Sequence, residues 1–368
     1  MSAAGDAPRA TPGDPPRLGF LGTGWIGRHR MTAIAASGHA TVAAVADAAP
    51  ASAEAAAAAA PGAAVVDSLD ALLALDLDGI VIATPSALHA EQAVRALERG
   101  CAVFCQKPLA RTAEETRAVV DAARAADRLL RVHLPYRQPA RMRAIRALVA
   151  DGALGHVHAV DLTFHNAYGP DKAWFYDPAL AGGGCVIDLG IHLVDLALWT
   201  LDFPPVVGAH GRLFAKGQAL VDPTTAVEDH ALATLDLAGG TVVRLACSWH
   251  LSAGQDAVIE AAFYGSEGGA ALRNVDGSFY DFTAHRFRGT AREALALPPD
   301  DWGGRAAVAW ARQLAAGGRY DPAVERLVDV AAALDAIYGR AGAPAGGDGG
   351  GVQGGRASAA ATPALVAS

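Results

Sequence analysis

Three glycines between an apolar run and a helix-like segment constrain the fold of this chain most strongly. Gly22, Gly24 and Gly27 form a GxGxxG motif that follows the apolar run 18–21 and opens the segment 25–36. Glycines at this spacing permit a tight turn and let the backbone approach a pyrophosphate at the helix N-terminus. Because a strand precedes the motif and a helix follows it, we expect a dinucleotide site rather than a plain glycine-rich turn.

An acidic residue stands where the second strand of such a unit ends. Asp47 follows the apolar run 41–46, about 20 to 25 residues after the glycines. A carboxylate there accepts a hydrogen bond from an adenosine ribose and repels a 2′-phosphate, so we expect NAD rather than NADP. The alternative is a solvated aspartate at a strand end. The cofactor contacts expected from this part of the chain are Gly22, Thr23, Gly24, Trp25, Ile26, Gly27 and Asp47.

The pattern of apolar runs divides the chain into two domains. Residues 17–138 alternate short apolar runs with helical stretches, which predicts a parallel α/β sheet with right-handed crossovers. Residues 139–340 contain longer strand-like runs separated by glycine turns, which predict an α+β domain with a mostly antiparallel sheet. The ends, 1–16 and 341–368, are rich in Ala, Gly and Pro, and we expect both to be disordered. The first of them lacks the apolar core of a secretory signal.

Composition narrows the range of partners. The chain has 368 residues, is 52% hydrophobic and carries a net charge of −8. No Lys/Arg-rich run is present, so we expect no nucleic-acid partner, and instead a small neutral or modestly charged ligand. No apolar stretch free of charges and helix breakers reaches membrane-spanning length, so we expect no membrane partner. The four cysteines form no CxxC pair and are expected to be buried free thiols of a cytoplasmic protein: Cys101, Cys105, Cys185 and Cys247.

Three ionisable residues interrupt the nearly all-apolar segment 182–195. If this segment is helical, Asp188, His192 and Asp195 occupy positions i, i+4 and i+7 and share one stripe. A carboxylate and an imidazole in an apolar setting are costly unless they are paired, and such a pair makes a general base. The alternatives are a satisfied core histidine and a divalent metal site, whose ligand types these residues match.

Together with the glycine motif, three further stretches resemble the Gfo/Idh/MocA family of oxidoreductases. They are Thr84-Pro85-Ser86-Ala87-Leu88-His89, Gln106-Lys107-Pro108 and the segment 182–195. The resemblance spans about residues 17–338. It implies an N-terminal Rossmann domain and a C-terminal domain whose open sheet often mediates homodimers or homotetramers. Members of this family mostly oxidise or reduce alcohol and ketone groups of sugars and cyclitols.

The resemblance also implies roles for individual residues. Lys107 corresponds to the active-site lysine beside the nicotinamide, and Asp188 and His192 correspond to a DxGxH pair in which the histidine transfers the proton. Gln106 replaces the commoner glutamate of the lysine motif, which keeps the size and an acceptor but removes a charge. The further residues that the resemblance places at the cofactor are Thr84, Pro85, His89, Gln106, Lys107 and Arg137.

Alcohol oxidation by a nicotinamide needs a hydride acceptor and a base at one carbon. We assign the base to His192, because its ordinary pKa lies near working pH. Lys107 is expected to stabilise negative charge on the reacting oxygen, and Asp188 to orient the imidazole or bind a neighbouring hydroxyl. Hydride chemistry of this kind needs no metal, so we expect none, and Asp195 is assigned a structural role.

The loop 164–177 is unusually rich in aromatic and polar residues and suits a sugar ring. We expect substrate contacts from His165, Tyr168 and Trp174, in addition to Lys107, Asp188 and His192; a surface loop or a subunit contact is the alternative. The pair 249–250, Trp-His, is a weaker candidate, and His230 is expected to belong to the sheet or an interface.

These observations favour an NAD(P)-dependent dehydrogenase or reductase that acts on CH–OH groups of a sugar or cyclitol. A relative that keeps NAD bound and recycles it within one turnover is a second hypothesis. A non-catalytic NAD-sensing protein is a third. The joint presence of Lys107, Asp188 and His192 argues against a sensor, which needs only the glycines and Asp47.

Overall fold

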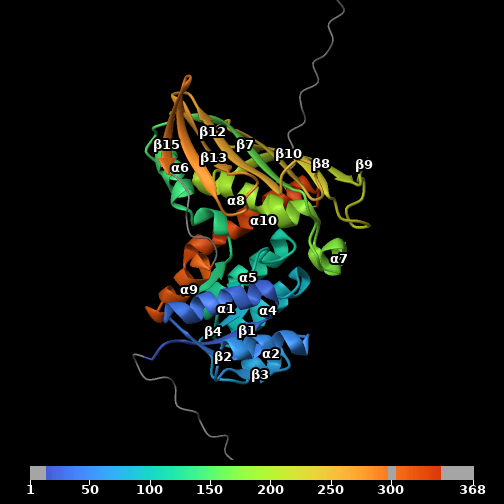
Figure 1. Ribbon diagram of the computed structural model, residues 1–368, viewed down its shortest axis with the longest axis vertical. Coiled ribbons are helices and arrows are strands. Elements are labelled where there is room, and N and C mark those ends of the chain that lie inside the picture. Colours follow the sequence, from blue (N-terminus) through green and yellow to red (C-terminus); the bar gives the residue numbers. More distant parts are fainter. Residues whose placement is uncertain (1–13, 297–303, 341–368) are drawn as a thin grey trace, which may run out of the picture.

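The computed structural model describes residues 14–296 and 304–340. They form two domains that follow one another along the long axis of the molecule (Figure 1). Most of the expected disordered ends, 1–16 and 341–368, lies outside the described residues.

The first domain is a parallel sheet of six strands in the order β3-β2-β1-β4-β5-β6. Its strands are buried apolar runs because helices cover both faces; all four residues of β4 are buried, for example. The strand order reverses between β1 and β4, which places a ligand-binding crevice at their carboxyl ends. The elements are β1 Arg17–Leu21, α1 Trp25–Ser37, β2 Thr41–Ala46, α2 Pro50–Ala59, β3 Ala64–Val66, α3 Leu69–Leu73, β4 Gly79–Ile82, α4 Ser86–Glu98, β5 Ala102–Cys105, α5 Ala113–Ala126 and β6 Leu130–Val132.

The second domain is built on a sheet of nine strands in the order β15-β14-β13-β12-β7-β11-β10-β8-β9. All neighbouring strands are antiparallel except β7 and β11, so the expectation of a mostly antiparallel sheet is confirmed. The strands are β7 Val157–Asn166, β8 Val206–Ala215, β9 Gln218–Ala219, β10 His230–Leu237, β11 Val242–Ser248, β12 Ala257–Gly265, β13 Gly268–Asn274, β14 Phe282–Arg288 and β15 Ala291–Ala296.

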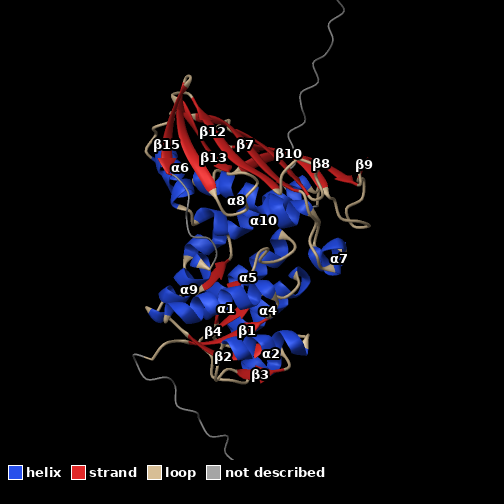
Figure 2. Ribbon diagram, viewed as in Figure 1, coloured by secondary structure: helices blue, strands red, loops and turns tan. Residues whose placement is uncertain are grey.

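Helices cover only one face of this second sheet. Figure 2 shows them between the two sheets, and within residues 14–296 and 304–340 no helix lies on the opposite face. That face carries exposed apolar side chains from β8, β10, β11 and β12: Val207, Leu232, Val242 and Tyr264. The helices of this part of the chain are α6 Ala140–Ala150, α7 Pro178–Ala181, α8 Ile191–Thr200, α9 Arg305–Ala315 and α10 Arg326–Ile337.

Two C-terminal helices tie the domains together. The α9 helix falls in the segment expected to belong to the second domain, yet it packs beside α1 on the first (Figure 1). Its Trp310 is buried against Phe104 of β5, with 5.7 Å between the ring centroids. In α10, Val328 joins the core of the first domain, whereas Leu334 joins the core of the second.

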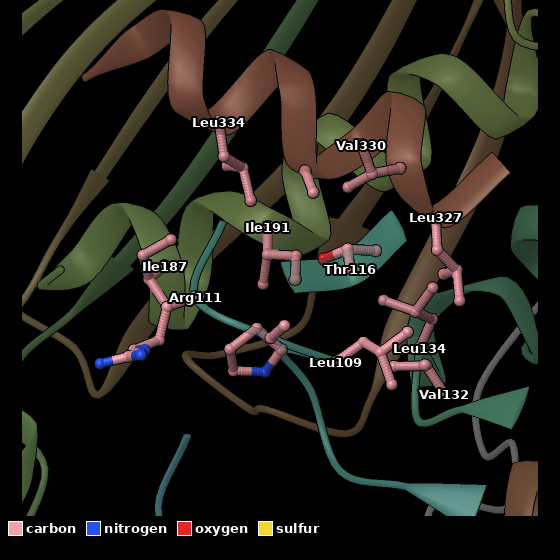
Figure 3. Close-up of a pocket in the computed structure, with 13 residues that line it drawn as sticks. Leu109, Arg111, Thr116, Val132, Leu134, Ile187, Ile191, Leu327, Val330 and Leu334 are labelled. Carbon is pink, nitrogen blue, oxygen red and sulfur yellow. The ribbon is translucent and has the colours of Figure 1, made fainter. Parts of the chain in front are cut away.

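The seam between the domains is apolar and tightly closed. Figure 3 shows Val330 and Leu334 of α10 on the side of Ile187 and Ile191, whereas Leu327 points towards Leu134 and Val132. Side chains of the first domain complete the seam, and the cavity left among them is only about 20 Å³, room for about one water molecule. Because the segment after Lys107 forms part of this seam, the lysine loop is fixed against the segment that carries Asp188.

The helical run Pro178–Thr200 is long and apolar enough to cross a membrane by length and composition, with a mean hydropathy of 1.5. In the structure, 83% of the 18-residue window that meets this test is buried inside the protein. The run comprises α7, a π-helical turn over Val186–Gly190, and α8. The four cysteines are buried and free, as the sequence predicts.

Candidate active site

The glycine motif forms the tight turn between β1 and α1. Gly22 has a φ of +84°, and a Cβ added at Gly27 would lie 1.9 Å from the carbonyl oxygen of Gly22. Only glycine fits such a close approach of helix and turn. No side chain caps the N-terminus of α1. Its first N–H groups are therefore available to an anion such as a pyrophosphate.

Asp47 lies next to this turn, at the carboxyl end of β2. One carboxylate oxygen accepts hydrogen bonds from the backbone N–H of Thr23 at 2.5 Å and from its hydroxyl at 3.3 Å. The other accepts from the N–H of Ala49 at 2.8 Å. The carboxylate is thus held in place beside the glycine turn and keeps lone pairs for a further donor.

His89 lies beneath the cofactor loops rather than at their surface. Only 1% of the residue is exposed, and its ring nitrogens lie 2.7 Å from the Pro108 carbonyl oxygen and 2.8 Å from that of Thr84. The imidazole therefore links the loop after β4 to the lysine loop after β5. These contacts fix the two loops relative to one another, and a direct contact of His89 with the cofactor stays a prediction.

The lysine loop and the second domain meet in an ion pair. The Lys107 ammonium donates to the Asp188 carboxylate at 2.5 Å and to the Asp188 main-chain carbonyl at 2.6 Å. The second carboxylate oxygen accepts from the indole N–H of Trp249 at 3.0 Å. The side chains of Lys107 and Asp188 are only 13% and 18% exposed, so water screens the pair weakly.

His192 lies close to this pair in an apolar setting. It is 7% exposed, and its ring packs edge-on against Tyr136 with 5.0 Å between centroids. Burial, and secondarily the positive charge of Lys107, lowers the pKa of His192 well below its usual value. The imidazole is therefore neutral near pH 7, as a base must be before it accepts a proton. Its lowered pKa makes it a weaker base than the ordinary value of histidine implies.

The three ionisable residues of the segment 182–195 do not act as one stripe. Residues Val186–Gly190 form a π-helical turn ahead of α8, which changes the rotation between successive side chains. Asp188 binds Lys107, His192 packs on Tyr136, and Asp195 binds Arg137. Among the described contacts, Asp188 makes no hydrogen bond to the imidazole, so the expected orienting bond is not formed.

A buried glutamate binds the backbone at the start of this turn, and the sequence had given it no role. Glu228 is fully buried, and its carboxylate accepts from the N–H groups of Gly184 and Val186 and from the Tyr338 hydroxyl at 2.7 Å. It satisfies donors that a helix start leaves free. A glutamate in a loop between two strand-like runs gives no local signal of this role.

Arg137 binds a carboxylate of the second domain in this structure, and its expected contact with the cofactor stays a prediction. Its guanidinium binds the Asp195 carboxylate through two nitrogens, one of them at 2.8 Å, and lies over the rings of Trp199 and Phe203. Asp195 is 2% exposed and needs this counter-charge. Asp195 thus forms the structural contact that its expected role requires, and its partner lies 58 residues earlier in the chain.

The three residues of the aromatic loop 164–177 that were expected to contact substrate each have a partner within the second domain. His165 binds the Ser248 hydroxyl and stacks on His230, Tyr168 donates to Asp256, and Trp174 stacks on Phe175. The structure does not bring these side chains to the cavity walls near Lys107, and their contact with substrate stays a prediction.

Lys172, another residue of this loop, was not expected from the sequence to lie near the cofactor site. Its ammonium lies 3.2 Å from the position that a Cβ on Gly24 would occupy. A cation from the second domain thus covers the N-terminus of α1, where a pyrophosphate is expected. Lys172 is the one lysine of the loop 164–177, and no motif around it gave a sequence signal for this contact.

A cavity of about 620 Å³ opens between the domains beside these residues. Lys107 and His192 line it together with the start of α1. Other side chains on its walls were not predicted from the sequence as site residues. The end of β6 lies at the carboxyl edge of the sheet, where ligands bind, and could have suggested His133 and Tyr136. The lining residues are Trp25, Ile26, His29, Arg30, Gln106, Lys107, His133, Pro135, Tyr136, Phe164, Leu189, His192, Phe279 and Tyr280.

Comparison with known proteins gives the same assignment. Residues 17–134 match the oxidoreductase family with an NAD-binding Rossmann fold, and residues 142–271 match the GFO/IDH/MocA C-terminal domain. The D-glucoside 3-dehydrogenase of Escherichia coli strain K12 is 31% identical over 64% of this chain and 68% of its own length. The inositol 2-dehydrogenase of Rhizobium meliloti strain 1021 is 32% identical over 70% and 76%.

Solved structures show the same fold. Levoglucosan dehydrogenase in complex with NADH and L-sorbose matches with a TM-score of 0.74 and 21% identity, over 88% of this chain and 96% of its own. The 3-ketoreductase KijD10 of Actinomadura kijaniata, in complex with NADP and TDP-benzene, matches with a TM-score of 0.76 and 23% identity, over 90% and 98%. With both domains matched in order, and with Lys107 and His192 lining one cavity beside the start of α1, this chain belongs to the Gfo/Idh/MocA family of oxidoreductases.

Proposed function

We propose that this protein is an NAD(P)-dependent oxidoreductase that transfers a hydride between a nicotinamide and a CH–OH or keto carbon of a sugar or cyclitol. One observation carries the proposal: the Lys107 ammonium, held by Asp188, and the buried neutral His192 line the same cavity as the start of α1. The relatives named above as dehydrogenases of a D-glucoside and of inositol support the substrate class.

Each residue contributes one part of the reaction. The cofactor, when bound, accepts the hydride from the alcohol carbon. Lys107 donates a hydrogen bond to the reacting oxygen and stabilises the negative charge that develops there. His192 takes the hydroxyl proton in oxidation and returns it in reduction. Asp188 fixes the ammonium, and the indole N–H of Trp249 in turn fixes the Asp188 carboxylate. Binding of a neighbouring substrate hydroxyl is the second role proposed for Asp188.

The cofactor site fits NAD better than NADP. The turn amides hold the pyrophosphate and Asp47 accepts from the adenosine ribose, where its charge opposes a 2′-phosphate. Relatives in this family bind either cofactor: the two solved structures contain NADH and NADP. The residues assigned to cofactor binding are Gly22, Thr23, Gly24, Trp25, Ile26, Gly27, Asp47, Thr84, Pro85, Gln106, Lys107 and, in addition, Lys172.

The remaining expectations concern assembly and location. The open face of the second sheet, with its exposed Leu232 and Val242, is suited to pairing with a second copy, so we propose a homodimer or homotetramer. Buried free thiols suit a reducing compartment, so the proposed location is cytoplasmic. The net charge of −8 disfavours a nucleic-acid partner.

A reduction screen tests the proposal. Purified protein is incubated with NAD⁺ or NADP⁺ and a panel of sugars, cyclitols, sugar acids and sugar phosphates, and absorbance of the reduced nicotinamide is followed. Turnover with at least one of them supports the proposal. Copurified NAD with product formation but no net NADH favours the recycling hypothesis, and NAD binding without any turnover favours the sensor.

A further inference from the structure

A buried arginine lines the cavity without an acidic partner. Arg30, on α1, is 5% exposed. One terminal nitrogen of its guanidinium lies 2.8 Å from His29 Nδ1 and the other lies 2.6 Å from His133 Nε2. Its Nε is buried and unpartnered, and among the described residues no carboxylate forms an ion pair with it.

The two imidazoles cannot neutralise this charge. A guanidinium has only donors, so both ring nitrogens that contact it act as acceptors and both rings are neutral. Burial, and secondarily the positive charge of Arg30, lowers the pKa of each ring. Burial also lowers the pKa of Arg30, to about 10, so the guanidinium stays charged near pH 7. A buried charge without a counter-charge is unfavourable, and an arriving anion offsets part of that cost.

Other unpartnered polar atoms lie on the walls of the same cavity. His133 Nδ1 and Gln106 Oε1 are buried without a hydrogen-bond partner. The positive charges of Arg30 and Lys107 both lower the pKa of His133. The pKa of His192 is lowered in the same way by Lys107 and by His133. The arginine end and the lysine end of the cavity are therefore electrostatic neighbours. The nearby carboxylate, Asp188, is already bound to Lys107.

We propose that Arg30 binds an anionic substituent, a carboxylate or a phosphate monoester, carried by the sugar or cyclitol substrate. The inference rests on the proposed function and narrows its substrate class to acidic sugars or cyclitols, in place of the neutral or modestly charged ligand that composition suggests. The planar guanidinium suits both oxyanions because it offers parallel donors. The volume of about 620 Å³ holds such a substituent next to a ring at Lys107.

The cofactor pyrophosphate is the other source of an anion, and it has donors of its own. The uncapped N-terminus of α1 and the Lys172 ammonium above Gly24 lie at the glycine turn. Arg30 lies more than one helical turn further along α1 and contacts the end of β6 instead. The substrate is therefore the better match for this guanidinium.

The first test compares specificity ratios. We measure kcat/KM for sugar acids, sugar phosphates and their neutral parent sugars in the wild type, in Arg30→Gln and in Arg30→Lys. The exposed Arg117→Gln serves as the charge-matched control. The acid-to-neutral ratio should favour acids in the wild type and in Arg117→Gln, and should fall roughly 10- to 150-fold in Arg30→Gln, with a smaller fall in Arg30→Lys. A ratio that Arg30→Gln leaves unchanged overturns the inference.

Two binding measurements complete the test. NADH affinity, followed by tryptophan fluorescence, should change little in Arg30→Gln. If NADH affinity instead falls by as large a factor as kcat/KM does, Arg30 belongs to the cofactor site and the inference is overturned. Inorganic phosphate titrated calorimetrically into the NADH-loaded wild type should bind, and bind more weakly to Arg30→Lys, even if no sugar is oxidised. Phosphate binding without any turnover would reject the proposed function alone, whereas absence of phosphate binding would reject the anion site.

Discussion

Asp188 holds the Lys107 ammonium through two different oxygens, the carboxylate at 2.5 Å and its own main-chain carbonyl at 2.6 Å. The two residues come from different domains and are 81 positions apart. The packing between the domains therefore sets the position of the charge that faces the reacting oxygen. The apolar seam of Figure 3 stabilises that geometry.

Replacing Asp188 with Asn should lower kcat by about 10²-fold, because a neutral amide no longer fixes the ammonium at the reacting oxygen. Steady-state kinetics at saturating NAD⁺ measure the change. Asp70→Asn is the matched control, since Asp70 pairs with Arg95 at the surface with 77% of its side chain exposed. Equal kcat values in the two variants would contradict the positioning role.

Replacing Arg137 with Met should destabilise the protein without loss of chemistry. The Asp195 carboxylate, 2% exposed, would lose its counter-charge, and we expect the free energy of unfolding to fall by about 3–5 kcal/mol. Chemical denaturation measures this. A second variant, Arg137→Met with Asp195→Leu, should recover much of the loss. Normal stability of the single variant combined with weakened NAD binding would instead return Arg137 to the cofactor site.

The stability of the protein should fall as the pH drops below about 6.5, the ordinary value for histidine. Burial lowers the folded-state pKa of His133 and His192, so the unfolded chain binds protons that the folded protein excludes. Each histidine contributes about 1.4 kcal/mol per pH unit between 6.5 and its folded pKa. Denaturation between pH 7.5 and 5.5 should show a smaller slope for His192→Asn than for the wild type. Identical slopes would be evidence against a buried neutral His192.

Replacing Asp47 with Ser should shift cofactor preference towards NADP. Removing the carboxylate removes its repulsion of a 2′-phosphate, and we expect the NAD-to-NADP ratio of kcat/KM to fall about 10- to 100-fold. Asp47→Glu keeps the charge and is the control. If the ratio is the same in the wild type and in Asp47→Ser, the carboxylate does not select the cofactor.

Local patterns predicted the first domain well. The strand Thr41–Ala46 has the predicted bounds, and the helix Trp25–Ser37 ends one residue beyond the predicted segment 25–36. A parallel strand covered on both faces leaves a short, continuous apolar run, and the glycine motif marks the start of the helix that follows. The strands Phe282–Arg288 and Ala291–Ala296 were missed. They lie at the edge of the second sheet, and their polar residues, such as His285 and Arg286, weaken the apolar signal.

The sequence predicted the site residues that lie in recognisable motifs. It did not predict the side-chain positions that depend on contacts between segments far apart in the chain. The sequence placed Lys107, Asp188 and His192 together, and the structure brings all three to one place. The π-helical turn, and the contact of Arg137 with Asp195, depend on packing between segments far apart in the chain. Nothing in the residues next to them reports that packing.

The central claim is that His192 transfers the proton, and one measurement tests it most directly: the rate of hydride transfer in His192→Asn compared with the wild type, with NADH affinity measured on both. The variant should bind NADH normally and react roughly 10²- to 10⁴-fold more slowly across the pH range. A His192→Asn protein that binds NADH and transfers the hydride at the wild-type rate would contradict the account.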